Sequence, residues 1–284
     1  MPDAPRFSVT IPAYNAEATL AETVSSVTSQ TFSDWELVIV NDGSTDGTRA
    51  LAERFAATDP RIRVVSQENR GSGGAYNTAV RTARADLLVM LSADDLLMPG
   101  HLAAFDAFID AHPEADVFTC DGYYEYDDGR AEPSTLHEDW ASPEECTLSD
   151  LLVACFYNMG AAYRRRVFDA VGGFREDLYA EDYLFYLLAL AMGFRHRRVP
   201  ERLSVHRRSS AQKSASHIRV RRADVAALEA VLATGLLDKP AQSIARRVIA
   251  HHRRTIAVRV ALAALLGQER STRVLDRLLG RSAS

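Results

Sequence analysis

The sequence predicts an α/β protein with a mostly parallel central sheet, helices on both faces of the sheet and a helical appendage at the C-terminal end. Two observations predict the sheet. Four apolar, strand-like segments alternate with helix-compatible segments over about 110 residues, and short polar stretches follow these strand-like segments. A third observation predicts the appendage, because apolar residues recur at helical spacing from residue 217 onward.

The predicted elements follow one another in a regular order. Helices are expected at 17–30 and 75–84 in the first half of the chain and at 183–192 in the second. Residues 160–174 indicate a strand followed by a short helix, and 123–149 indicate a long loop or hairpin. The other predicted strands span residues 6–11, 35–40, 62–66, 87–91, 116–120 and 194–206.

Composition indicates an ordinary globular protein. At 284 residues, with 47% hydrophobic and 25% charged residues, the chain can form one large domain or two modest ones. The three cysteines are odd in number and lack metal-ligand spacing, so we expect reduced thiols. We find neither a basic, apolar leader nor a segment apolar enough for a transmembrane helix, and therefore expect a cytoplasmic protein.

The net charge of −5 conceals two regions of opposite sign. Residues 191–284 contain 20 Lys+Arg and 6 Asp+Glu, which gives +14, whereas residues 1–190 contain 13 and 32, which gives −19. The basic region suits peripheral contact with anionic lipid at the inner face of the membrane, a phosphorylated acceptor, or a partner subunit in a homodimer. A solvated helical surface is the alternative, and no nucleic-acid partner is expected.

Two adjacent carboxylates, Asp94 and Asp95, follow the apolar segment 87–91. Side by side at the end of a buried strand they repel each other, and a bound Mg²⁺ or Mn²⁺, which also suits a diphosphate, would remove that repulsion. The alternative is a solvated turn that caps the next helix. Because ligands bind at the carboxyl ends of the strands in such sheets, and polar residues follow all four strands, we favour a small-molecule site.

A second acidic pair, Glu181 and Asp182, stands at the start of the apolar helix 183–192. It either provides a general base for the same site or is stabilised there by the exposed N–H groups of the helix. His206, near the end of the last predicted strand, is either a metal ligand or a surface histidine. Since no G-x-G-x-x-G motif follows the first strand, a dehydrogenase is not favoured.

Several of these stretches resemble motifs of the family 2 glycosyltransferases, which have the GT-A fold. The resemblance covers residues 6–208, leaves out the C-terminal helices and rests on independent motifs that occur in the family's order. The matching stretches are 9–15 with Glu17, 36–48, 69–71, Asp94-Asp95 with 98–100, Arg164-Arg165, 172–174 and Glu181-Asp182.

The resemblance implies an inverting transferase that uses a nucleotide diphosphate sugar, with UDP favoured, and a divalent metal, Mn²⁺ or Mg²⁺. The acceptor would be a hydroxyl of a glycan, a lipid-linked molecule or a small molecule. Pro12, Tyr14 and Glu17 would line the nucleotide pocket, and Asp42 would hydrogen-bond the base.

The resemblance assigns metal binding to the first acidic pair and catalysis to the second. Asp94 would bind the metal as the acidic member of a D-x-D-type motif, and Asp95 beside it would support the metal or the ribose. Asp182, next to Glu181, would be the catalytic base. With these assignments His206 becomes a further candidate metal ligand.

Two positions depart from the family pattern. Ser92 stands where the family usually has an acid, so it can bond a ribose but adds no charge to a metal site. Tyr76 replaces a cation that would meet phosphate, and Arg70 is the residue that could compensate. These departures keep two alternatives open: a nucleotide-sugar-binding partner subunit without catalysis, and a nucleotidyltransferase.

The predicted domain organisation follows from the extent of the resemblance. Residues 1–208 would form the glycosyltransferase domain, with a nucleotide-sugar-binding half at 6–112 and an acceptor and catalytic half at 113–208. Residues 209–284 would form the basic helical region.

Overall fold

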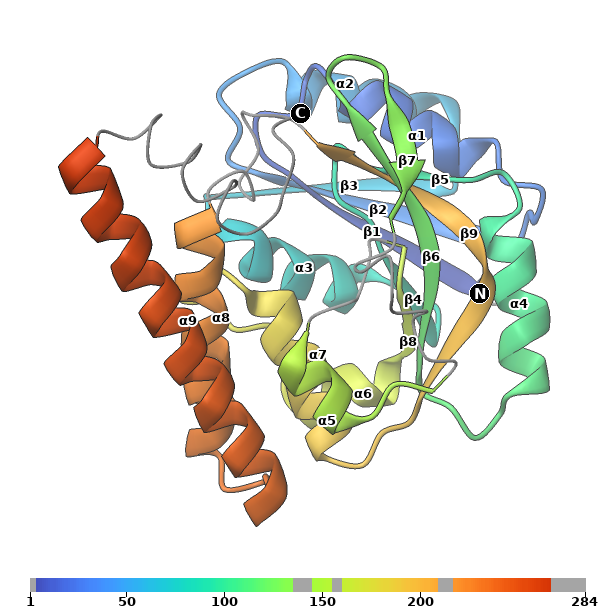
Figure 1. Ribbon diagram of the computed structural model, residues 1–284. Coiled ribbons are helices and arrows are strands. Elements are labelled where there is room, and N and C mark those ends of the chain that lie inside the picture. The colour runs from blue at the N-terminus through green and yellow to red at the C-terminus, as the bar shows by residue number, and fades with distance from the viewer. Residues whose placement is uncertain (1–3, 135–144, 155–159, 209–216, 267–284) are drawn as a thin grey trace.

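The first half of the chain forms the parallel part of one large sheet. A computed structural model describes residues 4–134, 145–154, 160–208 and 217–266. In it, four strands lie side by side in the order β3-β2-β1-β4, and all three pairings are parallel. These strands are β1 (Phe7–Ala13), β2 (Trp35–Asp42), β3 (Ile62–Gln67) and β4 (Leu87–Met90). The predicted parallel sheet is confirmed, and Figure 1 shows helices on both of its faces.

Strand β2 is buried along its whole length, because helices cover both faces of this sheet. Val38 and Val40 belong to one apolar cluster, which includes side chains of α3, whereas Leu37 and Ile39 belong to a second cluster with α1 and α4. The alternation follows from the two-residue period of a strand. The covering helices are α1 (Leu20–Thr28), α2 (Thr48–Thr58), α3 (Gly71–Thr82) and α4 (His101–Ala111).

The second half of the chain extends the sheet with mixed pairing. From β4 the order continues as β8-β6-β9-β5, with β6 and β9 parallel and the other contacts of this part antiparallel, and β7 pairs with β6. The strands are β5 (Leu96–Leu97), β6 (Val117–Tyr126), β7 (Ala131–Pro133), β8 (Ala162–Arg164) and β9 (His196–Arg208). The helices between them are α5 (Leu148–Val153), α6 (Arg165–Val171) and α7 (Glu181–Ala191).

Two of the differences from the predicted boundaries lie in α3 and β6. Helix α3 begins at Gly71, four residues earlier than predicted, because its glycines fit against the segment that precedes α7: a Cβ on Gly73 would lie 2.7 Å from the carbonyl oxygen of Arg175. The fifth predicted strand continues to Tyr126 and forms a short hairpin with β7, so the hairpin alternative is confirmed for the start of 123–149.

The C-terminal helices α8 (His217–Ala233) and α9 (Lys239–Leu266) pack on the sheet domain. Val225, Leu228 and Val231 of α8 and Ile249 of α9 are buried in the same apolar cluster as the side chains of α7. Within the described residues, the helical region therefore shares one core with the sheet domain. No helix in these residues is long and apolar enough to cross a membrane.

Two of the three cysteines lie within the described residues. Cys120 and Cys146 are buried, and neither forms a disulfide within the described residues. Burial raises the pKa of Cys120 to about 12, so this thiol stays protonated at neutral pH. Cys155 lies outside the described residues.

Candidate active site

The turn after β4 is anchored to β9 through Asp95. Asp95 is fully buried, and its Oδ1 accepts a hydrogen bond of 3.0 Å from the backbone N–H of Arg207, while its Oδ2 lies 3.0 Å from Nδ1 of His206. Burial raises the pKa of Asp95, and the charge of Asp94 adds to this, although His206 acts in the opposite direction. The carboxylate of Asp95 therefore joins two strand ends that are 111 residues apart.

Asp94 differs from its neighbour in burial. Its side chain is half-buried, so this carboxylate keeps access to solvent at the end of the sheet. Among the described residues, no three His, Cys, Asp or Glu side chains are grouped so that they could hold a metal ion. A metal at this edge would therefore take most of its ligands from a bound diphosphate and from water, as Mg²⁺ usually does.

The second acidic pair begins α7, as the sequence predicted. Glu181 is buried, whereas Asp182 is half-buried and its Oδ1 accepts a hydrogen bond of 2.7 Å from the backbone N–H of Tyr183. This contact is the helix-start stabilisation that was the alternative to a general base, and it leaves Oδ2 for other partners.

Carboxylates of both acidic pairs act electrostatically on Tyr76 of α3. The phenol is buried, and its pKa is raised first by this burial and then by the negative charges of Asp182 and Glu181, with a smaller contribution from Asp95. The hydroxyl of Ser92 acts in the opposite direction. Tyr76 of α3 thus lies within electrostatic reach of side chains from the turn after β4 and from the start of α7.

The loops after β1 and β2 are joined to each other at the same edge of the sheet. Glu17 accepts a hydrogen bond of 2.8 Å from the backbone N–H of Gly47, and Oδ1 of Asn15 accepts one of 2.9 Å from the backbone N–H of Thr45. Tyr14 is 53% exposed, so its ring faces solvent. Pro12 is half-buried on β1.

Asp42 and Arg70 lie one strand further along. Oδ1 of the buried Asp42 accepts hydrogen bonds from Nε2 of Gln67 at 2.7 Å and from the backbone N–H of Arg70 at 2.9 Å, which fixes its carboxylate at the end of β2. The guanidinium of Arg70 forms a two-pronged ion pair with Glu176, with Nη2 2.6 Å from Oε1 and Nε 3.2 Å from Oε2. Arg70 is thus held beside the segment that leads to Asp182.

A buried amide that sequence reasoning missed connects α3 to this segment. Asn77 donates from Nδ2 to the carbonyl oxygen of Phe174 at 2.9 Å and accepts from its backbone N–H at 2.8 Å. Gly173 has φ of +90°, and a Cβ there would lie 2.7 Å from Oδ1 of Asn77. The sequence shows a glycine pair before Phe174, but it does not show that Asn77, 97 residues before Phe174, binds there.

Asp224 of α8 is a second group that the sequence did not reveal. Burial raises its pKa to about 6, and the charge of Asp182 adds to this effect while Arg221 opposes it. One of its oxygens lies 3.7 Å from Nδ1 of His252. The helical region thus places a carboxylate within electrostatic reach of the candidate base.

The comparison with known proteins decides the family. The family model described as "Glycosyl transferase family 2" matches residues 8–172, which is more than half of the chain. The chain belongs to glycosyltransferase family 2. This membership favours a glycosyltransferase over a nucleotidyltransferase or a subunit without catalysis.

Relatives of the chain include glycosyltransferases from bacteria. The uncharacterized glycosyltransferase EpsJ of Bacillus subtilis is 30% identical over 211 residues, which cover 72% of this chain and 61% of EpsJ. A UDP-Glc:alpha-D-GlcNAc-diphosphoundecaprenol beta-1,3-glucosyltransferase, WfgD of Escherichia coli, is 38% identical over 96 residues, or 34% of this chain and 37% of WfgD. The chain thus spans less than two thirds of these relatives.

Solved structures confirm the GT-A fold. The mannosyltransferase PcManGT from Pyrobaculum calidifontis, solved with GDP-Man and Mn²⁺, superposes with a TM-score of 0.70 at 24% identity and covers 98% of this chain and 81% of its own. TarS of S. aureus with UDP-GlcNAc superposes with a TM-score of 0.66 at 23% identity, covering 87% and 71%. At 23% and 24% identity, these superpositions show a shared fold and nothing more.

Proposed function

We propose that this family 2 enzyme is an inverting glycosyltransferase with Asp182 as the general base and a nucleotide diphosphate sugar, preferably a UDP-sugar, as the donor. The observation that carries the proposal is the convergence of the turn after β4 and the start of α7 around Tyr76. This arrangement brings a base candidate to the edge of the sheet where a diphosphate would bind.

The chemistry follows from these positions. As the acceptor oxygen attacks the anomeric carbon, a bond forms between them and the bond from that carbon to the diphosphate oxygen breaks. The acceptor's proton passes to the half-buried carboxylate of Asp182. Because attack comes from the face opposite the leaving diphosphate, the configuration at the anomeric carbon is inverted. Glu181, buried beside Asp182, would hold negative charge near the base.

We assign the nucleotide to the loops after β1 and β2. Asp42 has Oδ2 left to accept from the base, because its two hydrogen bonds from Gln67 and Arg70 end on Oδ1. The exposed ring of Tyr14 suits stacking on the base, with Pro12 and Glu17 beside it. The nucleotide sugars in the solved relatives, UDP-GlcNAc and GDP-Man, support a donor of this class.

The diphosphate and its metal belong at the turn after β4. The residues there fit a metal that a diphosphate completes: Asp94 offers a half-buried carboxylate, and His206 has Nε2 left because Nδ1 faces Asp95. A bound Mn²⁺ or Mg²⁺ would neutralise the charge that builds on the leaving diphosphate. Asp95 would position the site, since its oxygens are engaged with β9. Ser92 would bond the ribose, and Arg70 would meet a phosphate after leaving Glu176.

The decisive experiment separates donor binding from transfer. Asp182→Asn should bind a UDP-sugar with Mn²⁺ as the parent enzyme does in calorimetry, yet transfer should fall by about 10²–10⁴-fold, the usual contribution of a general base. Asp177→Asn is the matched control, because Asp177 lies on the same segment but is 65% exposed and paired with Arg175. Normal turnover by Asp182→Asn would remove the base assignment.

The metal assignment has its own test. Asp94→Asn should abolish the Mn²⁺-dependent part of donor binding in a thermal-shift titration while leaving the melting temperature of the free enzyme near that of the parent. Unchanged metal dependence in this variant would refute the role of Asp94 without touching that of Asp182.

A further inference from the structure

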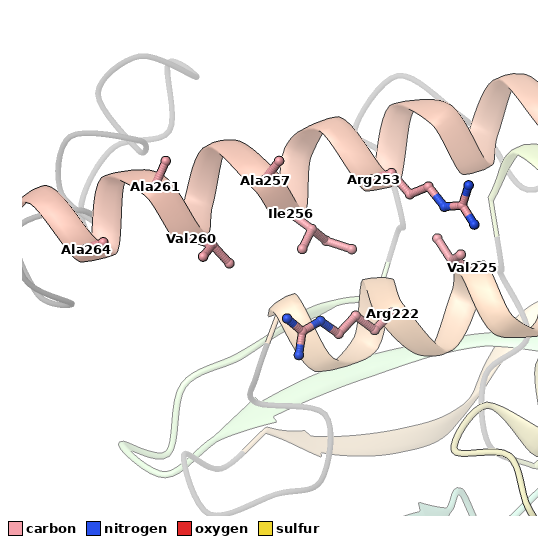
Figure 2. A pocket seen from close by; sticks show the side chains of 8 residues that line it. All are labelled: Arg222, Val225, Arg253, Ile256, Ala257, Val260, Ala261 and Ala264. Atoms are coloured by element: carbon pink, nitrogen blue, oxygen red, sulfur yellow. The ribbon is translucent and has the colours of Figure 1, made fainter.

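A groove of about 610 Å³ lies between α8 and α9. Figure 2 shows Ile256 and Val260 on the side of α9 that faces α8, with the side chain of Arg222 extending from α8 beneath them. The described residues that line the groove are Arg222 and Val225 of α8, and Arg253, Ile256, Ala257, Val260, Ala261 and Ala264 of α9.

The part of α9 that forms this groove is apolar and exposed. Residues 256–266 contain a single charged residue, Arg259, among ten apolar ones. This part of α9 extends past the beginning of α8, as both figures show, and Val260 remains 46% exposed. An apolar surface of this kind is costly in water and marks an interaction site.

The charges around the groove are positive. Residues 217–266 contain nine Lys and Arg against three Asp and Glu. Arg253 forms an ion pair with Glu229, whereas no described residue forms an ion pair with the exposed Arg222. A second copy of α8 and α9 would bring the same excess of positive charge against this surface, which opposes association. An anionic amphiphile complements both the apolar lining and Arg222.

We infer that this groove binds the acyl chain of an anionic phospholipid, with the lipid phosphate against Arg222, and so docks the enzyme on a membrane surface. Basic and apolar side chains on one helical surface are the combination that interfacial helices use. Arg222 and Val225 flank Asp224, which is within electrostatic reach of Asp182, so docking here would hold the catalytic edge near the lipid surface. Lipid binding does not depend on the proposed transfer reaction.

Vesicle flotation with the full chain tests the inference. The chain should float with vesicles of phosphatidylglycerol and phosphatidylcholine, less so at high salt, and not with phosphatidylcholine alone. Arg222→Gln should weaken binding about fivefold, the effect of one basic residue at a membrane surface. Val260→Asp should weaken it at least roughly tenfold, because it places a charge in the apolar groove.

Each variant has a matched control on the same two helices. Val258 is 52% exposed and lies about 200° around the helix from Val260, outside the described lining of the groove, so Val258→Asp should bind nearly as the parent does. Arg246 is an exposed arginine of α9 that does not line the groove either, so Arg246→Gln should have less effect than Arg222→Gln.

Three results would overturn the inference. One is absence of flotation with anionic vesicles. Another is an equal loss of vesicle binding in each variant and its control, which would mean that diffuse charge or the whole helix, rather than the groove, is responsible for binding. The last is a dimer in light scattering that Val260→Asp dissociates, without vesicle binding, which would assign the groove to a second copy of the chain.

Discussion

Replacing Asp224 with asparagine should stabilise the protein at neutral pH. This carboxylate is only 23% exposed, and burial raises its pKa to about 6 from an ordinary value of 3.8, with the charge of Asp182 adding to the effect and Arg221 opposing it. His252, 3.7 Å away, gives it little charge compensation at pH 7, because burial lowers the pKa of this imidazole and keeps it neutral.

The magnitude follows from the two pKa values. Because the folded-state pKa is the higher one, the contribution of Asp224 to stability is present below pH 3.8 and is lost as the pH rises through 6. The loss amounts to about 1.5 kcal/mol at pH 5 and about 3 kcal/mol at pH 7.5. An uncharged asparagine avoids this loss, so the advantage of Asp224→Asn in free energy of unfolding should double across that range.

Urea denaturation at pH 5 and pH 7.5, followed by circular dichroism, measures the difference. Glu229→Gln is the matched control, since Glu229 is a carboxylate on the same helix but is 45% exposed, and it should change stability by less than about 1 kcal/mol at either pH. A variant Asp224→Asn that is less stable than the parent, or an advantage independent of pH, would refute the argument that this buried charge opposes folding.

The remaining predictions concern three contacts near the candidate site. Asn77→Ala should lower the free energy of unfolding by about 2–4 kcal/mol in urea denaturation, because it leaves the buried backbone N–H and carbonyl of Phe174 without partners. Arg165→Met should lower the melting temperature, since the Arg165 guanidinium donates to backbone carbonyls around the end of α3; an unchanged value would show that water replaces these bonds. Arg70→Gln should raise the KM for the donor about tenfold with a smaller change in kcat, whereas an unchanged KM would leave Arg70 only its ion pair with Glu176.

The sequence determined the elements that position the site. Apolar-rich segments of five or six residues predicted the strands of the parallel half, and the acidic pairs Asp94-Asp95 and Glu181-Asp182 marked a strand end and a helix start, where the structure has them. Local patterns suffice there, because strand burial and helix starts depend on residues close together in the chain.

The sequence could not distinguish the two carboxylates of the first pair. Asp95 is fully buried against His206 and the backbone of Arg207, whereas Asp94 keeps access to solvent. That difference arises only when β9 pairs beside β5, so it depends on contacts between segments more than 100 residues apart.

What the sequence by itself determined is the kind of protein: alternating strands and helices, polar strand ends and the motif order of a glycosyltransferase. Only the tertiary structure decided how the pieces meet. It brought Tyr76 within electrostatic reach of both acidic pairs, joined Asn77 to Phe174 and placed Asp224 within electrostatic reach of Asp182. These outcomes follow from burial and charge between distant segments, which no pattern of neighbouring residues encodes.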